Sequence, residues 1–171
     1  MHFCPQCGAP QPQPVCVWPH KCQKCGTEHF CSPKPVVAVI LHAWPLDQGP
    51  MGIVAIRRGL SPYKGEWAFP GGYIDHAEDW RRAAAREVRE ELGIGLDPNQ
   101  FYLRGEPVVT PTNYLVLFVQ YTDEVLLTSA MTPSPQEVLD IRVLTKKDQD
   151  DPTFNMGVPS HQTTWKSLTF L

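Results

Sequence analysis

The sequence lacks long apolar runs, a basic leader and any marked excess of charge. No apolar run reaches the ~18 residues that a membrane-spanning helix needs, and the first ten residues, MHFCPQCGAP, have neither the basic nor the apolar region of a signal peptide. The formal net charge is -3 and the pI is near 6.0, so bulk charge does not indicate a nucleic-acid-binding surface. We therefore expect a cytoplasmic protein that contacts neither a membrane nor nucleic acid.

Charged residues are scarce, at 19% of the chain, whereas apolar residues make up 42%. This balance excludes a highly charged disordered chain and allows a hydrophobic core. A length of 171 residues suits one ordinary domain with a small appendage. The first 34 residues contain few aliphatic side chains and all six cysteines, so this part needs a cross-link, such as a bound metal ion or disulfides, to fold. We predict two domains, residues 1–34 and 35–171.

The cysteines include two C-x2-C-G pairs with 14 residues between Cys7 and Cys22. Because disulfides are rare in the cytoplasm, this spacing favours a structural Zn²⁺ ion in a zinc ribbon. The expected zinc ligands are Cys4, Cys7, Cys22 and Cys25. The alternatives are a redox pair, a disulfide set and a site that has lost its metal. Four nearby residues are not needed as ligands: Cys16, Cys31, His20 and His29.

Apolar periodicity after Pro35 predicts several strands and at least one helix. The expected strands are 36–43, 51–58, 66–69, 101–109, 114–122 and 137–144, and the expected helices are 79–92 and 160–170. The first two strands can form a hairpin around a turn at residues 45–52. Because strands and helices do not alternate regularly, this order favours an α/β fold with a mixed sheet packed between helices.

The predicted helix at residues 79–92 gathers three carboxylates on one face. Asp79 is a suitable N-cap and Gly93 a suitable stop. At about 100° per residue, Glu87, Glu90 and Glu91 fall within an arc of roughly 100°. An adjacent arc should face the sheet and consists of Ala84, Ala85, Val88 and Leu92. A solvated helix face with Glu/Arg pairs four residues apart is the alternative interpretation.

Three unpaired carboxylates on one face would repel one another, and a divalent cation relieves this repulsion. Oxygen ligands suit Mg²⁺ or Mn²⁺. Ala83 is small where a larger side chain would crowd the metal, and Arg86 can orient Glu90 four residues later. Upstream, Gly72 can bring the backbone close to a ligand or metal. Glu78 can pair with a basic group or help to hold a metal.

The segment from Gly72 to Ile94 resembles the box of the Nudix family, G-x5-E-x7-R-E-U-x-E-E-x-G-U, in which U is a bulky aliphatic residue. The matching residues are Gly72, Glu78, Arg86, Glu87, Val88, Glu90, Glu91, Gly93 and Ile94. The resemblance implies an α/β/α sandwich that hydrolyses a nucleoside diphosphate linked to another group. It also implies that Glu87, Glu90 and Glu91 bind magnesium. In the same way it implies that Arg86 orients a glutamate and that Gly72 lies in the catalytic loop.

The cysteine pairs ahead of this box resemble the zinc-ribbon subgroup of the family, which includes FAD, ADP-ribose and NADH pyrophosphatases. Residues 25–41, CGTEHFCSPKPVVAVIL, look like the junction between ribbon and hydrolase domain in that subgroup. NADH pyrophosphatases carry an SQPWPFPxS motif downstream. Residues 108–121 read VVTPTNYLVLFVQY instead, so we do not expect a preference for NADH.

A purine base needs an aromatic surface and a few polar contacts. The expected substrate-binding residues are Arg57, Tyr63, Tyr73 and Tyr114. Other aromatic candidates are Trp67, Phe69 and Phe118. For each of these aromatic residues, the tyrosines included, packing in the core or at its rim is the more common role. Arg58 can also face phosphates, and Lys64 lies in a loop that could close over a site. The sequence gives His161 and Trp165 no role.

We therefore expect a Mg²⁺- or Mn²⁺-dependent pyrophosphohydrolase with a structural Zn²⁺ ion, acting on a nucleotide-derived small molecule such as ADP-ribose or FAD. The alternative is a zinc-ribbon module that binds nucleic acid or protein and carries a nucleotide-sensing Nudix domain. In a third interpretation, the ribbon only stabilises the fold or a homodimer interface. The sequence leaves open which carboxylate acts as the base, how many metal ions bind and which substrate is used.

Overall fold

The computed structural model describes residues 2–11, 18–45, 49–127 and 133–169. The chain divides into two compact units, Met1–Pro33 and Lys34–Leu171. Cys16 and part of the predicted turn at 45–52 lie outside the described residues. None of the helices in these ranges is long and apolar enough to cross a membrane.

The smaller unit consists of two short antiparallel hairpins. Its strands are β1 (His2–Phe3), β2 (Pro10–Gln11), β3 (His20–Lys21) and β4 (Glu28–His29), pairing as β1-β2 and β3-β4. The turn of each hairpin carries one C-x2-C-G pair. Gly8 and Gly26 have φ angles of 68° and 77°, in the left-handed region that favours glycine. In both turns the glycine N–H donates to the carbonyl of the first cysteine, at 2.8 and 2.9 Å.

The larger unit contains two mixed sheets. The first comprises β5 (Lys34–Ile40), β9 (Phe101–Leu103), β10 (Val108–Val109) and β11 (Tyr114–Tyr121). The second comprises β6 (His42–Trp44), β7 (Gly52–Arg58), β8 (Trp67–Ala68), β12 (Val125–Leu126) and β13 (Val138–Leu144). The β5–β11 and β6–β12 pairs are parallel and the others are antiparallel.

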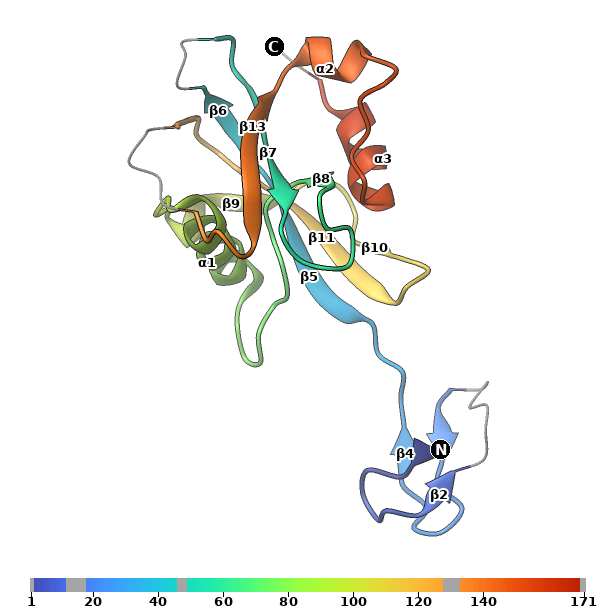
Figure 1. Ribbon diagram of the computed structural model, residues 1–171. Helices are drawn as coiled ribbons and strands as arrows, with labels where there is room; N and C mark the ends of the chain where they lie inside the picture. The colour runs from blue at the N-terminus through green and yellow to red at the C-terminus, as the bar shows by residue number, and fades with distance from the viewer. Residues whose placement is uncertain (1, 12–17, 46–48, 128–132, 170–171) are drawn as a thin grey trace. The chain divides into compact units, whose positions relative to one another are not determined.

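Helices cover both faces of these sheets, which confirms the predicted mixed α/β architecture (Figure 1). They are α1 (Trp80–Leu92), α2 (Lys146–Asp150) and α3 (Pro159–Ser167), with a 3-10 turn, η1, at Pro98–Gln100. Alternation along β5 divides the core. Val37 and Val39 pack in the cluster that includes α1, whereas Ala38 and Ile40 pack in the cluster that includes Trp165 of α3.

Two predicted strands are each divided in the structure. The stretch 36–43 forms β5 and β6, which belong to different sheets, so the hairpin with β7 is made by β6 and not by the whole run. The stretch 101–109 forms β9 and β10, separated by Gly105 with a φ of 76°. The short helix α2 was not predicted from the sequence.

Candidate functional site

Helix α1 begins and ends where the sequence predicts. The Asp79 side chain accepts a hydrogen bond from the Arg81 N–H at 2.9 Å, and Gly93, with φ 73°, donates to the Arg89 carbonyl at 2.9 Å. The expected apolar arc does face the core. Ala83, which we expected beside the metal, is fully buried and packs in that core.

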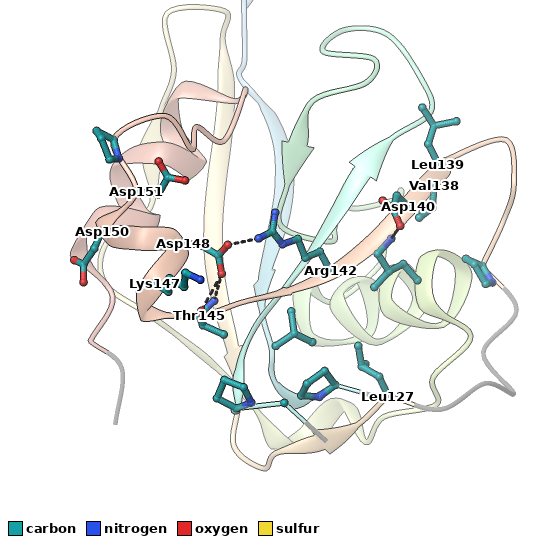
Figure 2. Close-up of a pocket in the computed structure, with 17 residues that line it drawn as sticks. Leu127, Val138, Leu139, Asp140, Arg142, Thr145, Lys147, Asp148, Asp150 and Asp151 are labelled. Atoms are coloured by element: carbon teal, nitrogen blue, oxygen red, sulfur yellow. Dashed lines mark hydrogen bonds and ion pairs between the residues drawn. The ribbon is translucent and has the colours of Figure 1, made fainter. Parts of the chain in front are cut away.

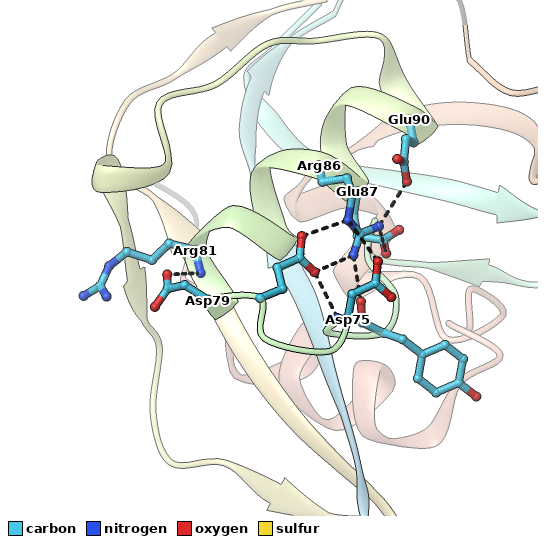
Figure 3. A network of polar contacts seen from close by, with 8 residues as sticks. Asp75, Asp79, Arg81, Arg86, Glu87 and Glu90 are labelled. Carbon is cyan, nitrogen blue, oxygen red and sulfur yellow. Dashed lines mark hydrogen bonds and ion pairs between the residues drawn. The ribbon is translucent and has the colours of Figure 1, made fainter.

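Arg86 is the centre of a polar network on the exposed side of α1 (Figure 3). Its Nε and Nη2 donate to the two carboxylate oxygens of Glu78, both at 2.9 Å. Its Nη1 donates to Glu87 Oε1 at 2.7 Å and to Glu90 Oε2 at 3.1 Å, and Nη2 also donates to the Tyr73 carbonyl at 2.8 Å. These contacts engage all five donors of the guanidinium. They lower the pKa of Glu78 and raise that of Arg86.

Glu91 lies deeper than the other two glutamates. Its side chain accepts a hydrogen bond from the Gly71 N–H at 2.7 Å, and only 6% of the residue is exposed. Burial raises the pKa of Glu91 to about 8, with a further contribution from the charge of Glu87. Burial also raises the pKa of Glu87, against the lowering effect of Arg86. Negative charge here is therefore under-compensated, which suits a divalent cation.

The Pro70-Gly71-Gly72 turn brings backbone against these carboxylates. A Cβ on Gly72 would lie 2.5 Å from Glu87 Oε1, and a Cβ on Gly71, which has φ 143°, would lie 2.1 Å from the Val37 carbonyl oxygen. Both glycines are therefore needed for close approach. Hydrogen bonds from Val37 to the Gly72 carbonyl at 2.9 Å and from Val39 to the Pro70 carbonyl at 2.7 Å fix the turn to β5.

The carboxylates line a cavity of about 350 Å³ that also contains Glu137. Glu137 precedes β13, and its charge raises the pKa of both Glu87 and Glu91. The loop that carries it is docked on α1, since the Ser134 N–H donates to the Glu90 carbonyl at 3.3 Å. Sequence reasoning missed Glu137, because no motif spacing connects this loop to α1.

A second cavity, of about 540 Å³ and mostly apolar, adjoins the first. The two cavities share five wall residues: Arg58, Pro62, Gly71, Gly72 and Tyr73. The predicted tyrosines Tyr63, Tyr73 and Tyr114 all line the apolar cavity. The Tyr73 hydroxyl donates to that of Tyr114 at 3.3 Å, with ring centroids 6.1 Å apart.

The other residues that the sequence suggested for substrate binding differ in where they lie. Arg57 is in neither wall, and its Nε donates to the Gly65 carbonyl at 2.9 Å. Phe69 and Phe118 are buried in the core cluster that includes α3. Arg58, which the sequence marked only as a second choice, is the arginine that faces both cavities.

A third cavity, of about 1570 Å³, lies along β13 (Figure 2). Its wall includes Asp140, Arg142 and Asp148, and Arg142 forms an ion pair with Asp148. None of the α1 carboxylates belongs to this wall. The carboxylates and tyrosines in their walls therefore identify the two smaller cavities as the candidate functional site.

The smaller unit gathers the four predicted zinc ligands, whose sulfurs all lie within 4.8 Å of one another. Two sulfur pairs, Cys4–Cys25 and Cys7–Cys22, are each separated by 3.8 Å. Four sulfurs bound tetrahedrally at about 2.3 Å from one zinc ion would lie about 3.8 Å apart. The backbone N–H groups of Cys25 and Lys24 lower the pKa of Cys22 to about 6, which favours the thiolate that metals bind.

Polar side chains surround this cysteine cluster. His29, which the sequence left without a role, has its Nε2 3.2 Å from Cys4 Sγ, and Gln11 Nε2 donates to Cys22 Sγ at 3.4 Å. His20 contacts the other end of the Gln11 side chain, with Nε2 2.8 Å from Oε1. Cys31 is not in the cluster.

Comparison with known proteins identifies similar chains. The NUDIX domain model matches residues 34–157. The NAD-capped RNA hydrolase NudC of Stutzerimonas stutzeri is 26% identical over 141 residues, which cover 82% of this chain and 46% of that protein. The ADP-ribose pyrophosphatase of Methanocaldococcus jannaschii is 40% identical over 42 residues, which cover 25% of each chain. The matched segments therefore cover less than half the length of either relative.

A solved structure supports the same architecture. A NUDIX hydrolase from Nitrosomonas europaea superimposes with a TM-score of 0.63 at 24% sequence identity, covering 97% of this chain and 89% of that one. At this level of identity the similarity shows a shared fold.

Proposed function

The chain belongs to the Nudix family, and from that premise we propose that it is a Mg²⁺- or Mn²⁺-dependent pyrophosphohydrolase acting on a nucleoside diphosphate linked to another group, such as ADP-ribose or FAD. The observation that carries the proposal is a carboxylate-lined cavity that opens onto an apolar cavity with three tyrosines in its wall. The carboxylate-lined cavity suits metal ions and a pyrophosphate, and the apolar cavity suits a nucleoside.

The donor set fits a hard divalent cation. Glu87, Glu90 and Glu91 offer carboxylate oxygens, the ligands that Mg²⁺ and Mn²⁺ prefer, and Glu137 faces the same cavity. We assign metal binding to these four residues. Bound ions would neutralise charge on the phosphate oxygens and lower the pKa of an attacking water. Glu78 is engaged by two donors of Arg86, so its proposed role is to hold Arg86 in place.

Arg58 and the tyrosines would bind the two ends of the substrate. Arg58 belongs to the walls of both cavities, where a guanidinium can pair with phosphate oxygens and fix the pyrophosphate across the junction. Tyr63, Tyr73 and Tyr114 would pack against the base and ribose, since aromatic rings combine apolar area with a polar tip. Arg57 is assigned no contact with substrate.

In the smaller unit, we assign the four clustered cysteines to a structural Zn²⁺ ion. His29 and Gln11 contact ligand sulfurs, and nitrogen donors at such positions commonly hold metal ligands in orientation. Among the described residues of this unit, the buried core consists of Cys4, Ala9 and Cys22, so zinc would supply folding energy that hydrophobic burial does not. Its proposed role is stabilisation of the chain.

The substrate class follows from residues 108–121 as much as from the relatives. NudC is named for NAD-capped RNA, but this stretch lacks the motif that we expect for NADH. Val108, Val109 and Tyr114 of this stretch line the apolar cavity instead. We therefore favour ADP-ribose or FAD, in line with the pyrophosphatase relative.

A substrate panel with labelled water tests this function. NADH, FAD, ADP-ribose, dinucleoside polyphosphates and nucleoside triphosphates would each be incubated with Mg²⁺ or Mn²⁺ in H₂¹⁸O. We expect metal-dependent release of a nucleoside monophosphate from ADP-ribose or FAD, with the label in one of the two phosphate products. Binding of these compounds without turnover would instead favour a nucleotide sensor.

A further inference from the structure

His161 in α3 lies next to the turn that approaches the carboxylates. Its Nδ1 accepts a hydrogen bond from the Phe69 backbone N–H at 3.1 Å. Strand β8 ends at Ala68, one residue earlier, and Phe69 itself leads into Pro70-Gly71-Gly72. The histidine therefore accepts the N–H at the point where the chain leaves the sheet for the turn.

Two aromatic rings hold the imidazole in this position. His161 stacks on Phe69, with ring centroids 5.4 Å apart and an interplanar angle of 26°. Phe118 of β11 meets the imidazole edge to face, at 5.7 Å and 72°. Ring geometries of this kind restrict both the position and the tilt of the imidazole. The hydrogen bond to Phe69 is therefore supported by packing of the imidazole against the Phe69 ring and against Phe118 of β11.

The hydrogen bond requires a neutral imidazole, because a charged one has donors at both nitrogens. Loss of hydration on burial lowers the pKa of His161 to about 3, and the charge of Arg58 acts in the same direction. At neutral pH the proton is therefore on Nε2, and Nδ1 remains available as an acceptor.

The turn beyond Phe69 contacts the carboxylates directly. The Gly71 N–H donates to Glu91, and Gly72 leaves no room for a Cβ beside Glu87. A shift of the chain at Phe69 would move both contacts, since only two residues separate Phe69 from Gly72. Hydrogen bonds from β5 hold the Pro70 and Gly72 carbonyls, and His161 holds the Phe69 N–H at the entrance of the turn.

Helix α3 also forms part of the wall of the apolar cavity. Val158, Pro159, Ser160 and Thr163 line it, and they bracket His161 in the sequence. The same helix thus contacts the proposed nucleoside cavity and the turn that holds the carboxylates.

We infer that His161 is a positioning residue, which places Gly71 and Gly72 so that Glu91 and Glu87 keep the geometry required for metal binding. The inference rests on the metal site assigned under the proposed function, but its metal-binding readout does not require turnover. His161 itself contacts neither the carboxylates nor the proposed metal ions.

Two substitutions of His161 distinguish the effect of its hydrogen-bond acceptor from the effect of the bulk of its imidazole ring. His161→Leu keeps a bulky side chain but removes the acceptor, whereas His161→Asn offers Oδ1 at the position of Nδ1. Leu168→Ala is the matched control, because Leu168 is buried in the same core cluster at the end of α3 and has no hydrogen bond to the turn.

Mn²⁺ affinity, measured by electron paramagnetic resonance without substrate, is the first readout. We expect His161→Leu to weaken Mn²⁺ binding by about tenfold, the lower end of the effect seen when a residue that orients a metal ligand is lost. His161→Asn should restore most of that affinity. Leu168→Ala should lower the melting temperature and leave the affinity unchanged. If His161→Leu and Leu168→Ala have the same Mn²⁺ affinity, the inference is wrong.

The metal concentration for half-maximal hydrolysis should follow the same order. If the wild-type chain hydrolyses no member of the substrate panel, the proposed function fails while the Mn²⁺ titration still tests His161. Should His161→Leu not fold, ¹⁵N NMR of the wild-type imidazole decides. A proton on Nδ1 would exclude the hydrogen bond to Phe69 and overturn the inference.

Discussion

At the scale of single residues, Arg86 connects more of the site than any carboxylate does. It bonds Glu78, Glu87, Glu90 and the Tyr73 carbonyl at once. A lysine has one nitrogen and three donors and cannot span these acceptors. Lysine in place of Arg86 keeps the positive charge but loses the planar arrangement of donors. The substitution therefore distinguishes positioning of the carboxylates from neutralisation of their charge.

We predict that Arg86→Lys lowers kcat by about 100-fold, as expected when reacting groups are misplaced by about 1 Å. Arg82→Lys is the matched control, because Arg82 lies on the exposed side of the same helix. Steady-state kinetics and thermal melting would be measured for both. Equal kcat values for the two variants would contradict the role of Arg86.

Gly72 tests the close approach of backbone to Glu87. Its φ lies outside the left-handed region, so alanine fits the backbone, but the Cβ would lie 2.5 Å from Glu87 Oε1. We expect Gly72→Ala to displace the carboxylate and lower activity by about 10- to 100-fold, as for other losses of ligand orientation, with little change in melting temperature. Gly95→Ala is the control, since nothing lies within 4 Å of its Cβ. Similar activity in both variants would argue against this contact.

His161 also predicts a pH dependence of stability. Its pKa is lowered to about 3 in the folded chain, so between that value and the ordinary value near 6.5 the unfolded state binds more protons than the folded state. The contribution of His161 to the free energy of unfolding should therefore fall as pH decreases from about 6.5, by at most about 1.4 kcal/mol per pH unit. The raised pKa values of Glu87 and Glu91 act in the opposite direction.

Urea unfolding between pH 4 and 7 measures this slope. His161→Leu should make the slope of unfolding free energy against pH less positive, whereas His76→Leu, at an exposed histidine, should leave it as in the wild type. A slope that is unchanged in His161→Leu would show that His161 is not held neutral by the fold.

At the scale of elements, local signals predicted some segments well and others only in part. Helix α1 follows from its cap, its apolar arc and its glycine stop, all of which are local in sequence. The run 36–43 is apolar apart from His42 and contains no glycine or proline, so no turn signal marks its division at Leu41. The division arises because β5 pairs with β11 and β6 pairs with β7, and such distant pairing is not encoded in periodicity.

The cysteine hairpins give a prediction at this scale. We expect about one zinc ion per chain in a four-cysteine site, lost in Cys25→Ser and retained in Cys31→Ser, whose cysteine lies outside the cluster. Metal content would be measured by mass spectrometry and stability by thermal melting. A strong chelator should lower the melting temperature of the full chain. Zinc retention in Cys25→Ser would contradict the assigned ligand set.

At the scale of the whole molecule, the site is assembled from segments that are far apart in sequence. Glu91 comes from α1, Glu137 from the loop before β13 and Arg58 from the end of β7, and α3 completes the apolar wall. The Nudix box predicted Glu91, because the glutamates of the box share one helix. The others depend on how the two sheets pack, so sequence patterns gave Arg58 only as a second choice and did not identify Glu137.

The central claim is that the carboxylate cavity hydrolyses a pyrophosphate with a bound divalent metal. The most direct test is the rate of Mg²⁺-dependent hydrolysis of ADP-ribose or FAD by the wild type, Glu90→Gln, Glu91→Gln and the control Glu106→Gln, at an exposed site outside both cavities. We predict that at least one α1 variant loses activity by about 100-fold or more, as for loss of a group that stabilises a transition state, while Glu106→Gln matches the wild type. Full turnover in both Glu90→Gln and Glu91→Gln would contradict the account.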